Sequence, residues 1–169
     1  MVNKLQKIST NLWFDSQAKE AANFYTSVFE NSEIGRITRY GKEGYEIHGK
    51  PEGTVMNVEF QLNGQPFVAL NGGSQIKFNE SISFIIHCET QEEIDYYWEK
   101  LSERGDEKAQ QCGWLKDQFG ISWQIVPAEL PEMLNDPDPE KASRVRQALL
   151  QMKKIDIATL KRAYAGETE

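Results

Sequence analysis

The feature that most constrains the fold of this chain is a pattern that occurs twice, 73 residues apart. Residues 18–29 carry apolar side chains at positions i, i+3, i+4 and i+7, namely Ala21, Phe24, Tyr25 and Val28. Residues 92–104 repeat this spacing with Ile94, Tyr97, Trp98 and Leu101. The spacing gathers apolar side chains on one face of a helix, and such a face has to be buried against another element. The repetition therefore predicts two related modules.

Strand candidates surround each predicted helix in the same order. In the first half they lie at residues 8–14, 34–40, 55–62 and 67–70, with the hairpin signal Asn63-Gly64 between the last two. Residues 41–53 hold four glycines and a proline, so we expect a loop there, with His48 exposed to solvent. In the second half the strand candidates lie at residues 82–88, 111–116 and 121–126. We therefore expect the α+β class, with two tandem β-α-β-β-β modules whose strands form a curved mixed sheet. Module one covers about residues 5–75 and module two about residues 79–127, which together form a domain at residues 1–127.

A C-terminal helical extension is expected at residues 128–169, outside the repeat. Asp138-Pro139 and Asp156 are helix-start signals, and each precedes a sparse apolar stripe. Residues 1–140 carry 12 Lys and Arg against 23 Asp and Glu, whereas residues 141–162 carry seven basic residues against one acidic residue. We expect the basic extension to pack on the acidic body, held mainly by apolar burial and oriented by charge.

The composition of the 169 residues is that of a globular protein, with 39% hydrophobic and 27% charged residues. The longest apolar run has four residues, far below the ~20 that a membrane-spanning helix needs, so we expect no membrane partner. The net charge of −7 argues against nucleic acid as the main partner. The first residues lack the apolar stretch and cleavage site of an export signal, so we expect a cytoplasmic protein with Cys88 and Cys112 reduced.

Several short motifs resemble those of a known family. They are Leu12-Trp13-Phe14-Asp15, Phe67-Val68-Ala69-Leu70-Asn71-Gly72-Gly73, Phe78-Asn79-Glu80-Ser81-Ile82-Ser83-Phe84, Cys112-Gly113-Trp114-Leu115-Lys116-Asp117 and Ser122-Trp123-Gln124. Over residues 8–127 the chain resembles the vicinal oxygen chelate superfamily of glyoxalase I, bleomycin-resistance proteins and extradiol dioxygenases. Within it, the motifs are most similar to the PhnB-like branch, catalogued as "3-demethylubiquinone-9 3-methyltransferase" domain proteins. The resemblance implies a glyoxalase-like domain whose sheets surround a cavity, a small-molecule ligand and a homodimer.

The residues do not favour the methyltransferase activity that this family name states. Adenosylmethionine usually binds at a glycine-rich turn between a parallel strand and a helix. The densest glycine site here, Asn71-Gly72-Gly73, follows a hairpin and precedes no clear helix. We therefore expect no methyltransferase activity, and we leave open whether the protein is an enzyme.

The resemblance also implies positions for metal ligands, which in the superfamily's enzymes hold a divalent cation. The last-strand position of module two falls on Gln124, and the first-strand position falls on or next to Ser81. Neutral amides and hydroxyls do not replace the imidazoles and carboxylates of a divalent-metal site. His87 and Glu89, two residues apart on one strand, would provide half a site at most. We expect no metal and no cofactor.

The expected site residues are therefore ligand-binding ones. Gln124, Asn71, Asn57, Trp114 and Ser81 are predicted to line the cavity, and His87 is the candidate catalytic base. Our first hypothesis is a metal-independent small-molecule-binding protein of the glyoxalase and bleomycin-resistance type. The alternatives are a lyase or isomerase that uses His87 as base in the same cavity, and an interaction module whose cavity is filled by side chains.

Overall fold

The computed structural model describes residues 6–167, and the chain divides into two compact units. Unit 1 extends to Phe78 and unit 2 begins at Asn79. Residues 1–5, where we expect no export signal, and residues 168–169 lie outside the described residues. Between residues 6 and 167, no helix is long and apolar enough to cross a membrane.

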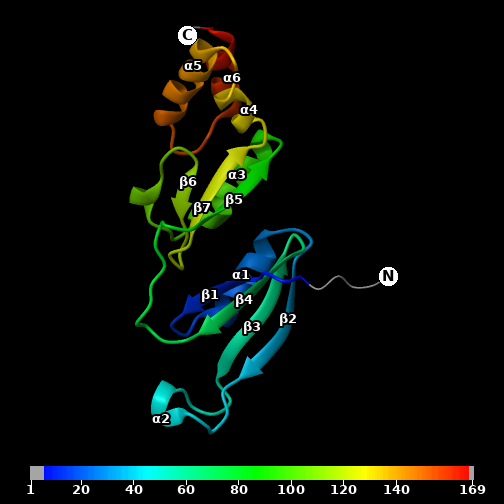
Figure 1. Ribbon diagram of the computed structural model, residues 1–169, viewed down its shortest axis with the longest axis vertical. Helices are drawn as coiled ribbons and strands as arrows, with labels where there is room; N and C mark the ends of the chain where they lie inside the picture. Colours follow the sequence, from blue (N-terminus) through cyan, green and yellow to red (C-terminus); the bar gives the residue numbers. More distant parts are fainter. Residues whose placement is uncertain (1–5, 168–169) are drawn as a thin grey trace, which may run out of the picture. The chain divides into compact units, whose positions relative to one another are not determined.

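Unit 1 is a four-stranded sheet with one long helix (Figure 1). Its elements in chain order are β1 (Thr10–Phe14), α1 (Ala18–Val28), β2 (Glu33–Arg39), the short helix α2 (Tyr45–His48), β3 (Val55–Leu62) and β4 (Gln65–Asn71). The strand order is β1-β4-β3-β2, with β1 parallel to β4 and the other pairs antiparallel. This is the β-α-β-β-β module expected from the sequence, with α2 inserted in the glycine-rich segment that was predicted to be a loop.

The apolar stripe of α1 packs on one face of this sheet. Ala21, Tyr25 and Val28 are buried, and the Tyr25 ring stacks on Phe60 of β3 at 6.4 Å between ring centroids. Because side chains alternate along a strand, the residues between the buried ones point to the other face, which we call the open face. Trp13 of β1 and Leu70 of β4 are half-buried and share the open face, since they are register partners.

Unit 2 repeats the plan with one strand fewer. Its elements are β5 (Ser83–Cys88), α3 (Gln91–Ser102), the 3₁₀ turn η1 (Glu107–Ala109), β6 (Trp114–Lys116) and β7 (Ser122–Pro127). The strand order is β5-β7-β6, with β5 parallel to β7. The α+β class is confirmed, but η1 stands where the module-one pattern would place a further strand.

The helices of the two units use the same positions of the repeated stripe. Ala21 and Val28 of α1 are buried, and so are Ile94 and Leu101 of α3, each 73 residues further along the chain. A capping box begins α3, in which Thr90 and Glu93 exchange side-chain and backbone hydrogen bonds. The duplication read from the sequence is therefore present in the burial pattern.

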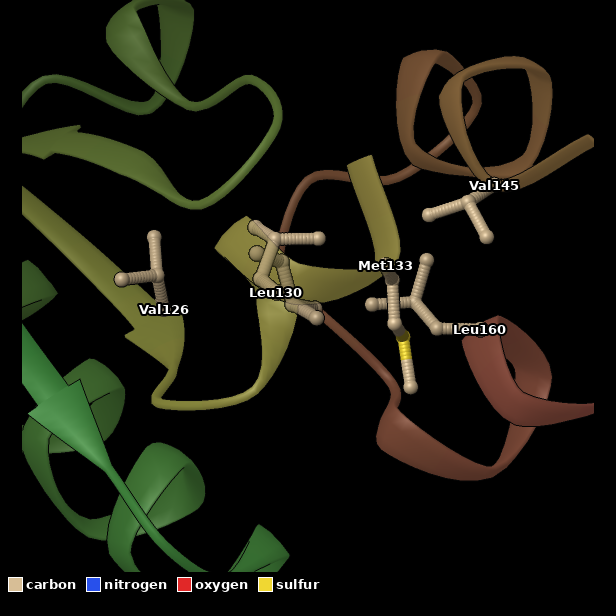
Figure 2. Close-up of a cluster of buried hydrophobic side chains, with 6 residues drawn as sticks. Val126, Leu130, Met133, Val145 and Leu160 are labelled. Atoms are coloured by element: carbon tan, nitrogen blue, oxygen red, sulfur yellow. The ribbon is translucent and has the colours of Figure 1, made fainter. Parts of the chain in front are cut away.

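The extension forms three helices within unit 2: α4 (Leu130–Leu134), α5 (Pro139–Leu150) and α6 (Ile157–Ala165). They enclose an apolar cluster with the end of β7, shown in Figure 2. Its buried members are Val126, Leu130, Met133, Val145, Ile155 and Leu160. The N-caps expected at Asp138 and Asp156 are present, because each side chain accepts a backbone hydrogen bond from the first turn of its helix. The helix α4 was not expected from the sequence.

Polar contacts tie the extension to the rest of unit 2. The Gln91 side chain on α3 donates to the carbonyl of Ile155 and accepts from the N–H of Ile157. Lys154 lies 2.6 Å from the carboxylate of Asp95, also on α3. The prediction that the basic extension packs on the acidic body is confirmed within this chain, with burial of Ile155 and Leu160 and ion pairing at Lys154.

Candidate functional site

A pocket of about 550 Å³ opens in unit 1, where β1 and β4 end. The glycine-rich segments 40–50 and 72–75 close its sides, and open-face residues of both strands form its floor. Its lining residues are Trp13, Asp15, Tyr40, Ile47, His48, Lys50, Leu70, Gly72, Gly73, Ser74 and Gln75. The volume lies within the range of small-molecule sites, ~300–1,000 Å³.

Asn71, one of the predicted ligand-binding residues, holds the segments around the pocket together. Its buried side chain accepts a hydrogen bond from the N–H of Ala18 at 2.8 Å and donates to the carbonyl of Val55 at 3.1 Å. Its backbone carbonyl accepts from the Tyr40 hydroxyl at 2.6 Å. The structure therefore places Asn71 on the helix side of the sheet, with its amide engaged inside the protein.

Two aromatic walls of the pocket are fixed by hydrogen bonds. The indole Nε1 of Trp13 donates to the carbonyl of Gly73 at 2.8 Å, and the indole lies directly over Gly72. A Cβ at position 72 would lie 2.2 Å from that ring, so the close approach requires glycine. The Tyr40 ring is fixed by its bond to Asn71 and lies 4.6 Å from the His48 ring, measured between centroids.

The charged side chains and the imidazole of the pocket come from the α2 segment and from the chain that follows β1. His48 accepts the backbone N–H of Lys50 at its Nδ1, 2.9 Å away, which leaves the proton of the neutral ring on Nε2. Lys50 extends toward Asp15, where its Nζ lies 3.3 Å from the carbonyl and 3.9 Å from the carboxylate. His48 therefore shapes the segment, and Lys50 brings a positive charge to the pocket rim.

Two of the predicted residues of unit 2, Gln124 and Trp114, lie side by side on the open face of its sheet. Gln124 lies on β7 between its register partners Ile85 on β5 and Trp114 on β6. Its Nε2 donates to the hydroxyl of Ser83 at 2.9 Å. Trp123, the neighbour of Gln124 on β7, points to the opposite, helix-covered face and is buried.

The other predicted residues lie farther from these contacts. His87 is exposed at the end of β5, on the open face opposite Val126, and no described side chain orients its ring. Ser81 precedes β5 and binds the side chain of Asn79 through its N–H and its hydroxyl. Asn57 of β3 is half-buried on the open face of unit 1, opposite the pocket residue Leu70. Since Asn57 and Asn71 belong to unit 1, the six predicted residues are divided between the two units.

The positions that the resemblance assigns to metal ligands do not fit a divalent cation. Gln124 offers an amide that already donates to a hydroxyl, and Ser81 is engaged with Asn79. Within residues 6–167, no group of three His, Cys, Asp or Glu side chains is arranged to hold a metal ion. These side chains are neutral, whereas divalent-metal sites use imidazoles, thiolates and carboxylates.

The two cysteines differ in exposure. Burial, together with the smaller effect of the nearby Glu93 carboxylate, raises the pKa of the Cys88 thiol to about 12, so this thiol stays protonated at neutral pH. Cys112 is half-buried and begins the hairpin with a left-handed backbone, φ 52°.

The pocket residues Tyr40, His48 and Lys50 were not expected from the sequence. His48 was assigned to a solvent-exposed loop, because glycines surround it in residues 41–53. The sequence does contain a usable signal, because Tyr40 precedes the glycine-rich segment and Lys50 lies near its end. The short helix α2 between them brings both to the pocket.

The two-sheet α+β fold with open faces defines a protein of the glyoxalase-like class. The family described as 3-demethylubiquinone-9 3-methyltransferase matches residues 6–126, and the chain belongs to this family. The resemblance to the PhnB-like branch of the vicinal oxygen chelate superfamily is thereby confirmed. No curated protein matches the chain.

Several solved structures are similar to this chain. A PhnB protein from Bacillus cereus is 40% identical, with a TM-score of 0.63, over 73% of this chain and 100% of its own length. Protein PA1353 from Pseudomonas aeruginosa shares the fold at 15% identity and a TM-score of 0.56, over 73% of this chain and 98% of its own. A Staphylococcus aureus protein is 30% identical over 74% of this chain and 98% of its own, with a TM-score of 0.32.

Proposed function

We propose that this chain binds a small organic molecule in the unit 1 pocket, as a metal-independent member of the glyoxalase and bleomycin-resistance type. The observation that carries the proposal is a pocket of about 550 Å³ whose aromatic walls are fixed by hydrogen bonds, Tyr40 to the last residue of β4 and Trp13 to the chain that follows it. Walls held in place before binding lose little conformational entropy when a ligand arrives.

The chemistry of the pocket supports binding rather than a particular reaction. The His48 ring uses both nitrogens within the α2 segment, since Nδ1 accepts from Lys50 and Nε2 faces the carbonyl of Glu43 at 3.2 Å. A general base needs a free lone pair within reach of a substrate proton. The exposed His87 lies on unit 2 without an orienting partner among the described side chains, so we assign it no reaction.

Metal independence and the lack of methyl transfer belong to the same proposal. The neutral side chains of Gln124 and Ser81 support the first part. For the second, Gly72 and Gly73 follow β4 and pack against the Trp13 ring, and no helix begins after them, as a glycine-rich adenosylmethionine turn would require.

The test is to equilibrate the purified protein with a metabolite mixture, separate it by gel filtration and identify retained compounds by mass spectrometry. Leu70→Trp fills the pocket floor, whereas Val68→Trp adds the same side chain on the same face of β4 outside the pocket. We expect the native protein and Val68→Trp to retain a compound that Leu70→Trp loses. Equal retention by all three proteins would contradict the pocket assignment, and so would the absence of any retained compound.

A further inference from the structure

A row of polar residues crosses the open face of the unit 2 sheet, at the end where β5 and β7 begin. Ser122 on the central strand β7 is the register partner of Lys116 on β6 and of Ser83 on β5. We call these three residues the polar row. All lie within unit 2 and outside the unit 1 pocket.

Ser122 is the unusual member of the polar row. Its residue is 2% exposed, and its hydroxyl is buried without any hydrogen-bond partner. An unpaired buried hydroxyl is unfavourable, and native proteins keep very few of them. Alternation along β7 places this hydroxyl on the open face, because Trp123 points to the helix side. The polar row therefore contains a hydrogen-bond donor that the protein itself leaves unused.

An ion pair lies beside this hydroxyl. The Lys116 ammonium contacts the carboxylate of Glu80, which stands three residues before Ser83 on the far side of β7. Lys116 is the register partner of Ser122, so the ammonium belongs to the residue next to this hydroxyl on the open face. The side chain of Lys116 is 23% exposed, but that of Glu80 is 61% exposed. The Lys116 ammonium is thus mostly covered by the sheet, whereas the Glu80 carboxylate can leave it for solvent. The loss of this contact costs little free energy, since exposed ion pairs contribute little to stability.

The next row of the open face is apolar on both sides of Gln124. Trp114 flanks it on β6, and Ile85, which is 50% exposed, flanks it on β5. Two residues along a strand advance about 6.8 Å, so the apolar row and the polar row are separated by about the width of a small aromatic ring. The face thus offers a cation and a free hydroxyl beside an aromatic and an aliphatic side chain.

We propose that the open face of unit 2 binds the carboxylate of a small organic acid with an apolar body. The ligand carboxylate replaces Glu80 as the partner of the Lys116 ammonium. It also accepts a hydrogen bond from the unpaired hydroxyl of Ser122, while the apolar body of the ligand packs on Trp114 and Ile85. Without a ligand the Glu80 carboxylate is paired with the Lys116 ammonium, so a ligand carboxylate has to displace it. The position of Lys116 also lowers the pKa of Glu80, because the ammonium donates to the ionised carboxylate.

The test uses benzoate as probe and benzamide as its uncharged analogue, with the ¹⁵N–¹H NMR signals of the full chain followed on titration. We expect benzoate to shift the amides of Lys116, Ser122 and Gln124, and benzamide to bind at least about tenfold more weakly, since hydrogen bonds to charged groups are the stronger ones. Lys116→Met and Ser122→Ala should each weaken benzoate binding. Glu80→Gln should strengthen it several-fold, because the competing carboxylate is removed.

Matched controls separate a binding role from a structural one. Lys108→Met and Glu103→Gln change equally charged, exposed residues of unit 2 outside the polar row and should leave benzoate binding unchanged. Ser122→Ala removes an unpaired buried hydroxyl, so it should keep or raise the stability of the fold while weakening binding. Benzoate shifts that are unaffected by Lys116→Met, or equal for benzamide, would overturn the proposal. Leu70→Trp should not alter benzoate binding, so failure of the unit 1 pocket is distinguishable from failure of this site.

Discussion

Asn71 connects three segments of unit 1 through one side chain and one carbonyl. The amide joins the start of α1 to the start of β3, and the carbonyl holds the Tyr40 ring against the pocket. Because the side chain is buried, water cannot replace these partners if the amide is lost. Asn71 thus fixes the segments that surround the pocket from the helix side of the sheet, and its amide does not face a ligand.

We predict that Asn71→Ala lowers the free energy of unfolding by about 1–3 kcal/mol, since it leaves a buried N–H and a buried carbonyl unpaired. Urea unfolding followed by circular dichroism measures this. Asn57→Ala is the matched control, because Asn57 is half-buried on the open face of the same sheet. A loss of stability at Asn57 as large as that at Asn71 would contradict this account.

Asp117 plays a comparable part in the hairpin between β6 and β7. One carboxylate oxygen accepts the N–H groups of Phe119 and Ile121, and the other accepts the indole N–H of Trp123 at 2.8 Å. A turn begins at this aspartate and ends at Gly120, whose N–H donates to the Asp117 carbonyl at 3.0 Å, and a type I turn favours Asp in the first and Gly in the fourth position. The hydrogen bond to Trp123 could not be predicted from the turn motif. It depends on the strand β7, which follows the turn and places the indole of Trp123 next to the Asp117 carboxylate.

We predict that Asp117→Ala destabilises the protein by about 1–3 kcal/mol, because it leaves buried donors without an acceptor. The exposed Asp106, whose carboxylate accepts the N–H of Lys108, is the control. Removing that cap should cost about 1 kcal/mol or less. Thermal unfolding of the two variants provides the comparison, and equal losses would count against a special role for Asp117.

At the scale of elements, periodic patterns predicted α1, α3 and most strands within a few residues. The errors fall where backbone conformation or tertiary contact decides. The strand expected at 111–116 shortens to Trp114–Lys116, because Cys112 and Gly113 have φ angles of 52° and 84° and cannot extend a strand. The helix α4 has five residues, too few for a recognisable periodicity, and exists because Leu130 and Met133 are buried by α5 and α6.

The candidate site was less predictable for a related reason. Residue spacing correctly placed Gln124 and Trp114 on the open face of one sheet, because side chains alternate along strands. The unit 1 pocket depends instead on how residues 40–50 turn, and the glycines Gly44 and Gly49 at both ends of α2 adopt left-handed conformations that no periodic pattern encodes.

The extension provides the element-scale prediction. Ile155 is fully buried in the apolar cluster of the extension, so Ile155→Ala should lower the free energy of unfolding by about 2–5 kcal/mol through lost burial and a cavity. Leu150→Ala is the control, since Leu150 is 62% exposed. Differential scanning calorimetry on both variants measures the difference, and similar melting temperatures would mean that the extension is not anchored at Ile155.

The N-cap of α6 adds a pH dependence to the extension. Hydrogen bonds from the side chain and backbone of Thr159 lower the pKa of Asp156. Since the folded-state pKa is depressed, this carboxylate contributes stability above its unfolded pKa and loses it as the pH falls through the folded value. Asp156→Asn should therefore flatten the fall in melting temperature between about pH 5 and pH 2. A fall as steep as in the native protein would contradict this role.

At the scale of the whole molecule, the neutral side chains at the inherited ligand positions make a direct prediction. Protein produced in metal-supplemented medium should carry no stoichiometric zinc, nickel, iron or manganese after gel filtration. Elemental analysis of the pooled fractions measures this. One equivalent of metal that survives gel filtration would refute metal independence while leaving the unit 1 pocket intact.

Self-association is the second prediction at this scale, since the resemblance implies a homodimer and we hypothesise that the extension packs near its interface. Deletion of residues 136–169 should weaken dimerisation as well as lower the melting temperature, because it removes α5 and α6 and opens the apolar cluster. Analytical ultracentrifugation over a range of concentrations measures the association. An unchanged association constant would separate the extension from the dimer contact.

The contact between the hairpin and the extension also affects how the sheet of unit 2 ends. The N–H groups of Cys112 and Gly113 donate to the carbonyls of Met152 and Lys153, while the Gly113 carbonyl accepts from Ile125 on β7. The extension thus pairs with the outer side of the chain that leads into β6, on a sheet that has no fourth strand. Unpaired strand edges recruit other chains into aggregates. The family match ends at residue 126, before the extension begins. A chain truncated at residue 126 would therefore expose a site for edge-to-edge aggregation that the extension covers in the full chain.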